Sequence, residues 1–168
     1  MTAQSREGQQ AVVGAVDKGL APAEAGPPPP GRFRIGEFVR WGDVDLAGII
    51  FYGAYVRFFE IAETELFRAV GFPYSHLFER FDFWLPRVQL HFEFRKPARL
   101  DERLDVEVWV GRIGSSSLRL EFEVRKASPE RELTADGYAV LVAVSRSDLR
   151  PIPLPPELVE ALAPYRAG

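Results

Sequence analysis

The feature that most constrains this fold is one long amphipathic helix pattern set among segments with strand-like alternation. From about Gly53 onward, apolar side chains recur at helical spacing, while charged residues take the other face. The apolar stripe consists of Tyr55, Phe59, Ala62, Leu66 and Val70, widened by Phe58 and Ala69. Gly71 and Pro73 end the pattern, as is typical of a helix C-terminus. A single helix of this kind can cover little more than one face of a sheet.

Strand-like patterns lie on both sides of this helix. Residues 32–41 precede it and alternate imperfectly. Regular alternation follows it in residues 87–94, 104–110 and 118–125, so that each segment has one apolar and one wet face. Residues 134–146 lose the alternation, which indicates a central strand covered on both faces. This order predicts an α+β fold with an antiparallel sheet of about five strands around one long helix.

The connections carry the residue types of turns. Short stretches with Pro, Gly and Ser lie at residues 96–98, 112–117 and 128–130, which predicts that strands adjacent in sequence pair antiparallel. Residues 74–83 form an aromatic connection whose structure the pattern leaves open, a turn of helix included.

The end of the chain predicts one more element. Pro155 and Pro156 favour a short closing helix over residues 157–165, since proline suits the first turn of a helix. A sheet covered by one helix still leaves its outer face or an edge for another subunit, so we expect a homodimer or homotetramer.

Length and composition indicate one domain. The chain has 168 residues, of which 46% are hydrophobic, enough for an ordinary core. Residues 1–31, which close with Pro27 to Pro30, predict a disordered N-terminal tail ahead of a domain over residues 32–168.

The same composition argues against several functional classes. A net charge of −3 gives no bulk reason to expect nucleic-acid binding. The absence of Cys excludes disulfides, thiolate metal sites and a cysteine nucleophile. No apolar run approaches the ~20 residues of a membrane helix, and no secretory signal pattern is visible, so we expect a cytoplasmic protein without a membrane segment.

A polar loop with two carboxylates directly precedes the helix. Residues 42–48 have the Gly and Asp content of a loop and contain Asp43 and Asp45. The first N–H groups of a helix lack acceptors and favour a developing anion, and Phe51 and Tyr52 lie where those donors should be. A carboxylate beside such donors is the arrangement needed to attack or hydrate a carbonyl.

The string from Gly42 to Tyr52, followed by Tyr55 and the segment 58–60, resembles the 4-hydroxybenzoyl-CoA thioesterase family of the hotdog fold. The resemblance covers roughly residues 33–149. It implies that Asp45 is the catalytic carboxylate and that the Tyr52 N–H polarises the thioester carbonyl. It also implies a curved antiparallel sheet around the helix, and two subunits that form two sites at their interface.

The family resemblance extends to substrate binding. It implies that Arg, Lys and Ser side chains on later strands hold the phosphates and pantetheine arm of coenzyme A. The turn at residues 112–117 occupies that region, with Arg112 as its one basic residue and Ser117 at its end. Phe51, Tyr52, Phe83 and Trp84 can wall an acyl pocket, although such aromatic residues also serve as core. Phe51 is the candidate that we take from this group.

Other polar residues have simpler interpretations. Asp43 can be structural, and a turn-forming role is the alternative for Asp45. Glu60, on the predicted helix, is a reserve candidate for the acid, because related hotdog enzymes carry a helical catalyst. His76 and His91 lack the spacing of metal ligands, so we expect neither a metal nor a cofactor.

These observations predict an enzyme that hydrolyses the thioester of an aromatic or short- or medium-chain acyl-CoA. A thiol leaves readily, since its pKa is roughly 8–9, so a carboxylate and an oxyanion site suffice. Asp45 can act as a nucleophile or as a general base, and the sequence does not separate the two routes. Two further readings stay open, namely a thioesterase for acyl groups on a carrier protein and a non-catalytic acyl-CoA-binding module.

Overall fold

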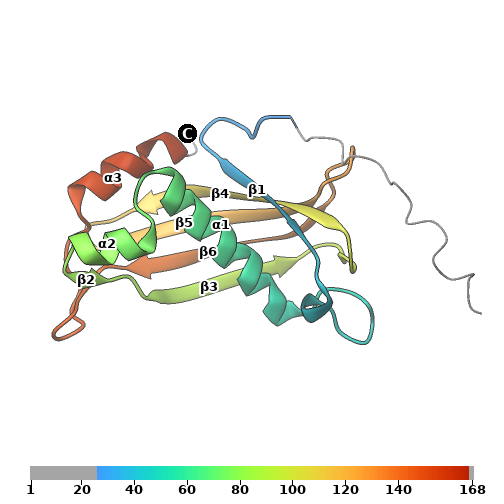
Figure 1. Ribbon diagram of the computed structural model, residues 1–168, viewed down its shortest axis with the longest axis horizontal. Coiled ribbons are helices and arrows are strands. Elements are labelled where there is room, and N and C mark those ends of the chain that lie inside the picture. Colours follow the sequence, from blue (N-terminus) through green and yellow to red (C-terminus); the bar gives the residue numbers. More distant parts are fainter. Residues whose placement is uncertain (1–25, 167–168) are drawn as a thin grey trace, which may run out of the picture.

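The computed structural model describes residues 26–166 and contains the predicted α+β architecture. Five antiparallel strands form one sheet in the order β1-β4-β5-β6-β3. Their bounds are β1 (Phe33–Phe38), β3 (Arg87–Phe94), β4 (Arg103–Ile113), β5 (Ser117–Lys126) and β6 (Leu133–Val142). The long helix α1 (Tyr55–Ala69) lies across one face of this sheet (Figure 1). The predicted tail falls largely on residues 1–25, which lie outside the described residues.

Aromatic stacking fixes α1 on the sheet. Phe59 of α1 stacks on Phe122 of β5 with 4.1 Å between ring centroids, and it lies 4.6 Å from Phe92 of β3. Phe122 and Phe92 flank Gly137 of β6 in register, so three strands contribute to the surface beneath this ring. The alternating apolar residues of β4 and β5 complete the buried layer below the helix. The helical stripe and the strand alternation seen in the sequence therefore meet in one core.

The shorter elements surround this core. They are η1 (Trp41–Asp43), η2 (Tyr52–Ala54), α2 (Tyr74–Arg80), β2 (Phe83–Trp84), β7 (Val144–Ser145), α3 (Pro156–Leu162) and η3 (Ala163–Tyr165). The aromatic connection left open by the sequence is thus mostly a helix, α2. The closing helix is confirmed as α3, which begins at Pro156 and continues into η3.

The pairing of sequential strands was predicted correctly for two hairpins and wrongly for the third connection. β4 pairs with β5, and β5 pairs with β6, both antiparallel. β3 and β4 do not pair, because β3 lies at one edge of the sheet and β4 lies beside β1 near the other. Residues 95–102 cross between these positions and are held by Ala98, which is fully buried and accepts a hydrogen bond from the Ile50 N–H. A short link with turn residues was mistaken for a hairpin.

β6, which the sequence predicted to be covered on both faces, is covered only in part on its outer face. β6 lies between β5 and β3 and is hydrogen-bonded on both sides, as expected of an internal strand. Val140 and Val142, on its outer face, are half-buried in the single chain. The strand also ends at Val142, within the apolar run, and after Ala143 the short strand β7 pairs with β2 instead of continuing the main sheet.

The outer face of the sheet carries an ion-pair network. Glu107 of β4 is buried and lies within 3.0 Å of guanidinium nitrogens of Arg32, Arg34 and Arg131. Burial alone would raise the pKa of Glu107, but hydrogen bonds from Arg34 and Arg32 outweigh it and lower that pKa below its ordinary value. The network ties the segment before β1, the sheet and the turn before β6 together.

Candidate active site

The acidic loop between β1 and α1 is anchored at both ends. The Val39 N–H donates to the Glu102 carbonyl, and the Ile50 N–H donates to the Ala98 carbonyl, each at 2.9 Å. Val44 and Ile50 form an isolated antiparallel bridge, which closes the loop on itself. The loop therefore holds a defined conformation ahead of the helix, next to the crossing segment that precedes β4.

Asp43 is the structural member of the carboxylate pair. It is buried, and its Oδ2 accepts a hydrogen bond from the Arg40 N–H at 2.8 Å. The guanidinium of Arg57, on α1, donates to both carboxylate oxygens, with 2.8 Å between Nε and Oδ1. The Asp43 carbonyl also accepts from the Phe51 N–H. Asp43 thus joins the loop to the start of the helix.

Asp45 has the opposite environment. Its side chain is exposed, and Oδ1 accepts the Ala47 N–H at 2.8 Å. This contact is the Asx turn expected from the simpler interpretation of the residue. Oδ2 accepts no hydrogen bond from the part of the chain that the structure describes, so one carboxylate oxygen is oriented by the turn and the other is free to react.

The start of the helix provides donors near this loop. The short helix η2 begins at Tyr52 and leads directly into α1. The Phe51 N–H donates a hydrogen bond to the Asp43 carbonyl, and the Ala54 N–H donates one to the Phe51 carbonyl. Within residues 26–166, the N–H groups of Tyr52 and Gly53 have no backbone acceptor. These two amides are therefore available to hold a developing negative charge.

An exposed apolar surface surrounds the loop. Tyr52 is 79% exposed and Leu46 is completely exposed, and the Phe51 ring meets the Tyr52 ring edge-on at 6.4 Å. Further exposed apolar side chains nearby are Phe38, Trp41, Val56 and Phe94. A group of exposed large apolar side chains such as this one is typical of a surface that binds a ligand or another chain.

The remaining predicted binding residues lie elsewhere in the chain. Phe38, at the end of β1 next to the loop, pairs with Arg103 at the start of β4, whereas Arg112 is near the end of β4. Arg112 is nine residue steps from Arg103 along β4, roughly 30 Å at the usual rise. Ser117 begins β5 across the turn and therefore lies at the same end of the sheet as Arg112. A single chain therefore does not bring Arg112 and Ser117 to Asp45, and their role in binding stays a prediction.

The helical acids belong to a different cluster. Glu60, the reserve candidate, is exposed. Glu63 is buried and accepts hydrogen bonds from the Tyr74 hydroxyl and the Arg87 guanidinium, which links α1 to α2 and β3. Burial, followed by the charge of Glu60, raises the pKa of the Tyr74 hydroxyl, so the phenol stays protonated. Sequence reasoning missed this cluster, because its partners are far apart in the chain.

The histidines are accounted for by simple contacts. His91 stacks on Tyr138 with 5.1 Å between ring centroids and lies 3.1 Å from a Glu93 oxygen, and His76 is exposed. The described residues contain no group of three acidic, His or Cys side chains placed to hold a metal ion. Within the same residues, no helix is long and apolar enough to cross a membrane.

The aromatic residues that were suggested for the wall of an acyl pocket lie partly in the core and partly at the surface. Phe83 is buried, whereas Trp84 is 42% exposed and faces an apolar pocket at the far end of β3 from the acidic loop. Phe78 and Leu149 line the same pocket and were missed, because an apolar residue in a connection gives no sign of the cavity that it faces.

A long helix that lies on an antiparallel sheet and is entered through an acidic loop is the architecture of the hotdog fold. The chain belongs to the thioesterase-like superfamily, whose family model matches residues 39–162. It is 30% identical to the acyl-CoA thioester hydrolase YbgC of Escherichia coli over 122 residues, which are 72% of this chain and 88% of that protein.

Solved structures agree on the fold. The 1,4-dihydroxy-2-naphthoyl-CoA thioesterase of Synechocystis matches with a TM-score of 0.74 at 21% identity, over 79% of this chain and 96% of that one. A 4-hydroxybenzoyl CoA thioesterase in complex with 4-hydroxybenzoyl CoA matches with a TM-score of 0.72 at 21% identity, over 79% and 99% of the two chains. The chain is thus a thioester hydrolase with the hotdog fold.

Proposed function

We propose that this protein hydrolyses an acyl-CoA thioester, with Asp45 as the catalytic carboxylate and the Tyr52 N–H as the principal oxyanion donor. The observation that carries the proposal is the free Oδ2 of Asp45 in a loop that leads directly to the unpaired amides of Tyr52 and Gly53. The relatives named above act on CoA thioesters, which supports CoA as the leaving group.

Both chemical routes end in the same products. As a nucleophile, Asp45 adds to the carbonyl carbon, the C–S bond breaks, and water cleaves the resulting anhydride. As a general base, Asp45 takes a proton from the water that attacks the carbonyl. In either case the carbonyl oxygen becomes negative in the transition state, where the Tyr52 N–H stabilises it, and the CoA thiolate leaves and takes up a proton.

We further propose that the working unit is a homodimer paired through β3. This strand forms one edge of the sheet, and its Val88, Leu90 and Phe94 are exposed in the single chain. An exposed apolar edge strand is a ready template for a second copy. Two β3 strands paired antiparallel would bring the β4–β5 turn of one copy, with Arg112 and Ser117, to the same end of the joint sheet as Asp45 of the other. That arrangement is the one in which these residues could assist CoA binding.

The test measures thiol release from acetyl-, octanoyl-, benzoyl- and dihydroxynaphthoyl-CoA. We expect hydrolysis by the wild type and a loss of about 10³-fold in kcat for Asp45→Asn, with KM nearly unchanged. Glu60→Gln is the matched control and should keep the wild-type rate, because Glu60 is the other acid considered for this step. Release that is unchanged in Asp45→Asn, or lost only in Glu60→Gln, would refute the assignment of Asp45.

Two outcomes would change the function itself. Hydrolysis of carrier-protein thioesters with no turnover of the CoA thioesters would move the substrate to the carrier-protein class. Saturable binding of acyl-CoA without any thiol release would leave a binding module.

A further inference from the structure

The acidic loop is closed by its own backbone, so Asp45 is held as part of one unit. The Asp45 N–H donates to the Ile49 carbonyl at 3.1 Å, and the Gly48 N–H donates to the Asp45 carbonyl at 2.9 Å. Val44 and Ile50 form the antiparallel bridge at the base of this turn. Because residues 44–50 are connected in this way, the position of the Asp45 carboxylate depends on where the two ends of the loop are fixed.

The two ends of the loop meet at Asp43 and Phe51. The Phe51 N–H donates to the Asp43 carbonyl at 3.1 Å, and the Phe51 carbonyl accepts from the Ala54 N–H at 3.0 Å. That carbonyl belongs to the same planar peptide unit as the Tyr52 N–H. The direction of the Tyr52 N–H is therefore fixed together with the Phe51 carbonyl, and this peptide is in turn tied to Asp43.

Arg57 connects Asp43 to the long helix. It is the third residue of α1, and helical side chains are inclined toward the N-terminus of their helix. Its Nε donates to Asp43 Oδ1 at 2.8 Å, its Nη2 donates to Asp43 Oδ2, and Nη2 also lies 3.3 Å from the Phe38 carbonyl oxygen. Two parallel hydrogen bonds from one guanidinium fix the orientation of a carboxylate as well as its distance.

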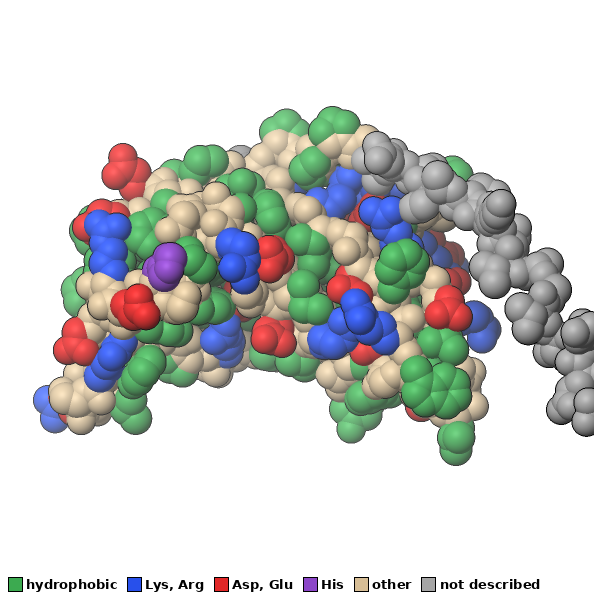
Figure 2. Space-filling model, in the orientation of Figure 1, with side chains coloured by type: hydrophobic (Ala, Val, Ile, Leu, Met, Phe, Trp, Pro, Cys, Tyr) green, Lys and Arg blue, Asp and Glu red, His purple; other side chains and the backbone are tan. Residues whose placement is uncertain are grey.

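In the part of the chain that the structure describes, no second cation is paired with Asp43. Arg40, the neighbouring arginine, directs its guanidinium to Glu37 instead, with 3.1 Å and 3.0 Å from Nε and Nη2 to Oε1. Figure 2 shows basic and acidic side chains gathered between the end of β1 and the start of α1, beside hydrophobic side chains of the projecting loop. The buried Asp43 therefore depends on the guanidinium of Arg57 for its side-chain link to α1.

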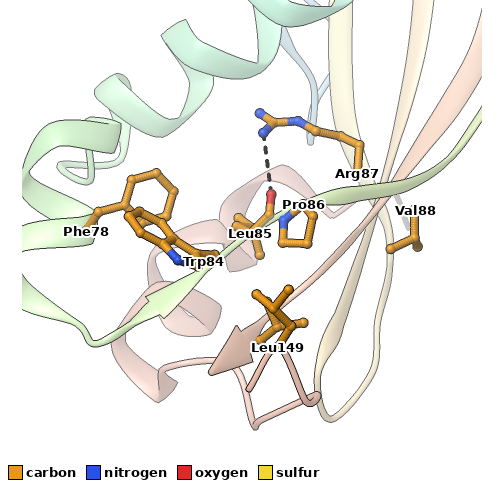
Figure 3. Close-up of a pocket in the computed structure, with 8 residues that line it drawn as sticks. Phe78, Trp84, Leu85, Pro86, Arg87, Val88 and Leu149 are labelled. Atoms are coloured by element: carbon orange, nitrogen blue, oxygen red, sulfur yellow. Dashed lines mark hydrogen bonds between the residues drawn. The ribbon is translucent and has the colours of Figure 1, made fainter. Parts of the chain in front are cut away.

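The helix itself is docked by other contacts. The Phe59 ring stacks on the sheet, and Glu63 accepts a hydrogen bond from the guanidinium of Arg87 on β3. Figure 3 shows Arg87 beside the apolar pocket at the start of β3, where its guanidinium also donates to the Leu85 carbonyl at 3.4 Å. Because these contacts hold α1 on the sheet, a change at Arg57 should act on the acidic loop and not on the packing of the helix.

We propose that Arg57 is a positioning residue of the thioesterase reaction, which through Asp43 sets the distance and direction between the Asp45 carboxylate and the Tyr52 N–H. The inference rests on the proposed function, in which these two groups act on the same carbonyl. Arg57 acts through Asp43 and contacts neither the thioester nor the reacting atoms. A displacement of about 1 Å can cost roughly 10²-fold in rate, so loss of this contact lowers kcat and changes KM little.

The first test replaces the guanidinium and keeps the charge. Arg57→Lys substitutes a point charge for the planar group, so the two parallel hydrogen bonds to Asp43 are lost. On the acyl-CoA that the wild type hydrolyses fastest, kcat should fall at least roughly tenfold, and KM should stay within about twofold of the wild-type value. The assay is run at a temperature at which circular dichroism shows the variant to be fully folded.

Arg131→Lys is the matched control. The side chain of Arg131 is 28% exposed, against 29% for Arg57, and its terminal nitrogens donate to the buried Asp105 and Glu107. The same substitution should lower Tm to a similar extent and leave kcat unchanged, because this cluster lies on the outer face of the sheet. An equal loss of kcat in both lysine variants would indicate a general effect of stability and would overturn the proposal.

Chemical rescue provides a readout that a loss of stability would not change. Arg57→Ala should lower kcat by about 10²-fold. Millimolar guanidinium chloride, far below denaturing concentrations, should then restore kcat in a saturable way, because the free cation can occupy the site beside Asp43. Sodium chloride at the same concentration should have no such effect, and Arg131→Ala should show no rescue. If Arg57→Ala does not fold, the comparison of the two lysine variants decides alone.

The outcomes separate this inference from the proposed function. A folded Arg57→Lys with the wild-type kcat, or a loss in folded Arg57→Ala that guanidinium does not reverse, would overturn the positioning role and leave the assignment of Asp45 intact. A raised KM at unchanged kcat would mean that Arg57 binds the substrate, and would overturn it as well. A wild type that releases no thiol from any thioester would instead refute the proposed function.

Discussion

The two carboxylates of the acidic loop are two residues apart and have opposite surroundings. Asp43 is buried and held by Arg57 and by the Arg40 N–H, whereas Asp45 is exposed and makes one turn contact. A buried carboxylate that loses its charge leaves an unpaired guanidinium, while an exposed one does not. Asp43 therefore has the surroundings of a structural residue, and Asp45 has those of the catalytic carboxylate proposed above.

This difference predicts opposite phenotypes. Asp43→Asn should lower the free energy of unfolding by about 3 kcal/mol and Tm by about 10 °C, because Arg57 loses its buried partner. Asp45→Asn should change stability by less than about 0.5 kcal/mol, since an asparagine oxygen still accepts the Ala47 N–H. Denaturant unfolding of both variants checks the pair. Equal destabilisation would mean that Asp45 is also structural.

Sequence patterns pointed to the proposed catalytic residues more readily than to the residues that support them. The polar loop and the helix start drew attention to this stretch, and the family resemblance implied the roles of Asp45 and Tyr52; both signals are local in sequence. Arg57 was visible only as a charged residue on the polar face of a helix. Its contact with Asp43 depends on how the helix docks, which no local pattern specifies. The roles of Asp45 and Tyr52 in catalysis await the activity measurements.

Among the elements, β4 carries a buried charge that several ion pairs hold in place. Glu107 is held by three arginines, and their hydrogen bonds lower its pKa despite its burial. A carboxyl whose pKa is lower in the folded state stabilises the fold fully above its unfolded pKa, roughly 4.3. That stabilisation is lost as the pH falls through the lower, folded value.

The expected consequence is a pH-dependent mutant effect. Glu107→Gln should destabilise the protein by about 3 kcal/mol at neutral pH, and the difference from the wild type should shrink once the pH is lowered below roughly 4. Glu121→Gln, which affects a less buried pair with Arg119, serves as control and should cost less than about 1 kcal/mol. Urea unfolding across a pH series measures both. A constant difference down to acidic pH would mean that the charge of Glu107 is not what stabilises β4.

The elements themselves show where periodicity succeeds as a guide. β3, β5 and α1 were recognised with nearly correct bounds, because alternating strands and an amphipathic helix leave a regular pattern. β3 was wrongly expected to be half-buried, since most of its residues are exposed in the single chain. The crossing at residues 95–102 was missed. Its Pro97 and Lys96 look like a hairpin turn, and only the buried Ala98 beneath Ile50 reveals that the chain passes from one side of the sheet to the other.

At the scale of the whole molecule, the open β3 edge governs the expected behaviour. Leu90→Lys places a charge on that edge and should convert the protein to a monomer with at least roughly tenfold lower activity, since the proposed sites combine two chains. Ala163→Lys adds the same charge at an exposed position in η3, next to the far side of the sheet, and should change neither property. Sedimentation analysis with thiol-release assays on the same samples tests this. An active Leu90→Lys monomer would contradict the dimeric site.

The unpaired edge of β3 also determines how the rate of turnover depends on the concentration of the protein. If each active site forms only when two β3 edges pair, the rate depends on the protein concentration more steeply than in direct proportion. At concentrations where most chains are monomers, doubling the protein concentration more than doubles the rate, because the fraction of chains in dimers also grows. Dilution in an assay would then abolish activity by dissociating the dimer, although each chain stays folded. Kinetic constants for this protein will have meaning only when its own concentration is stated beside that of the substrate.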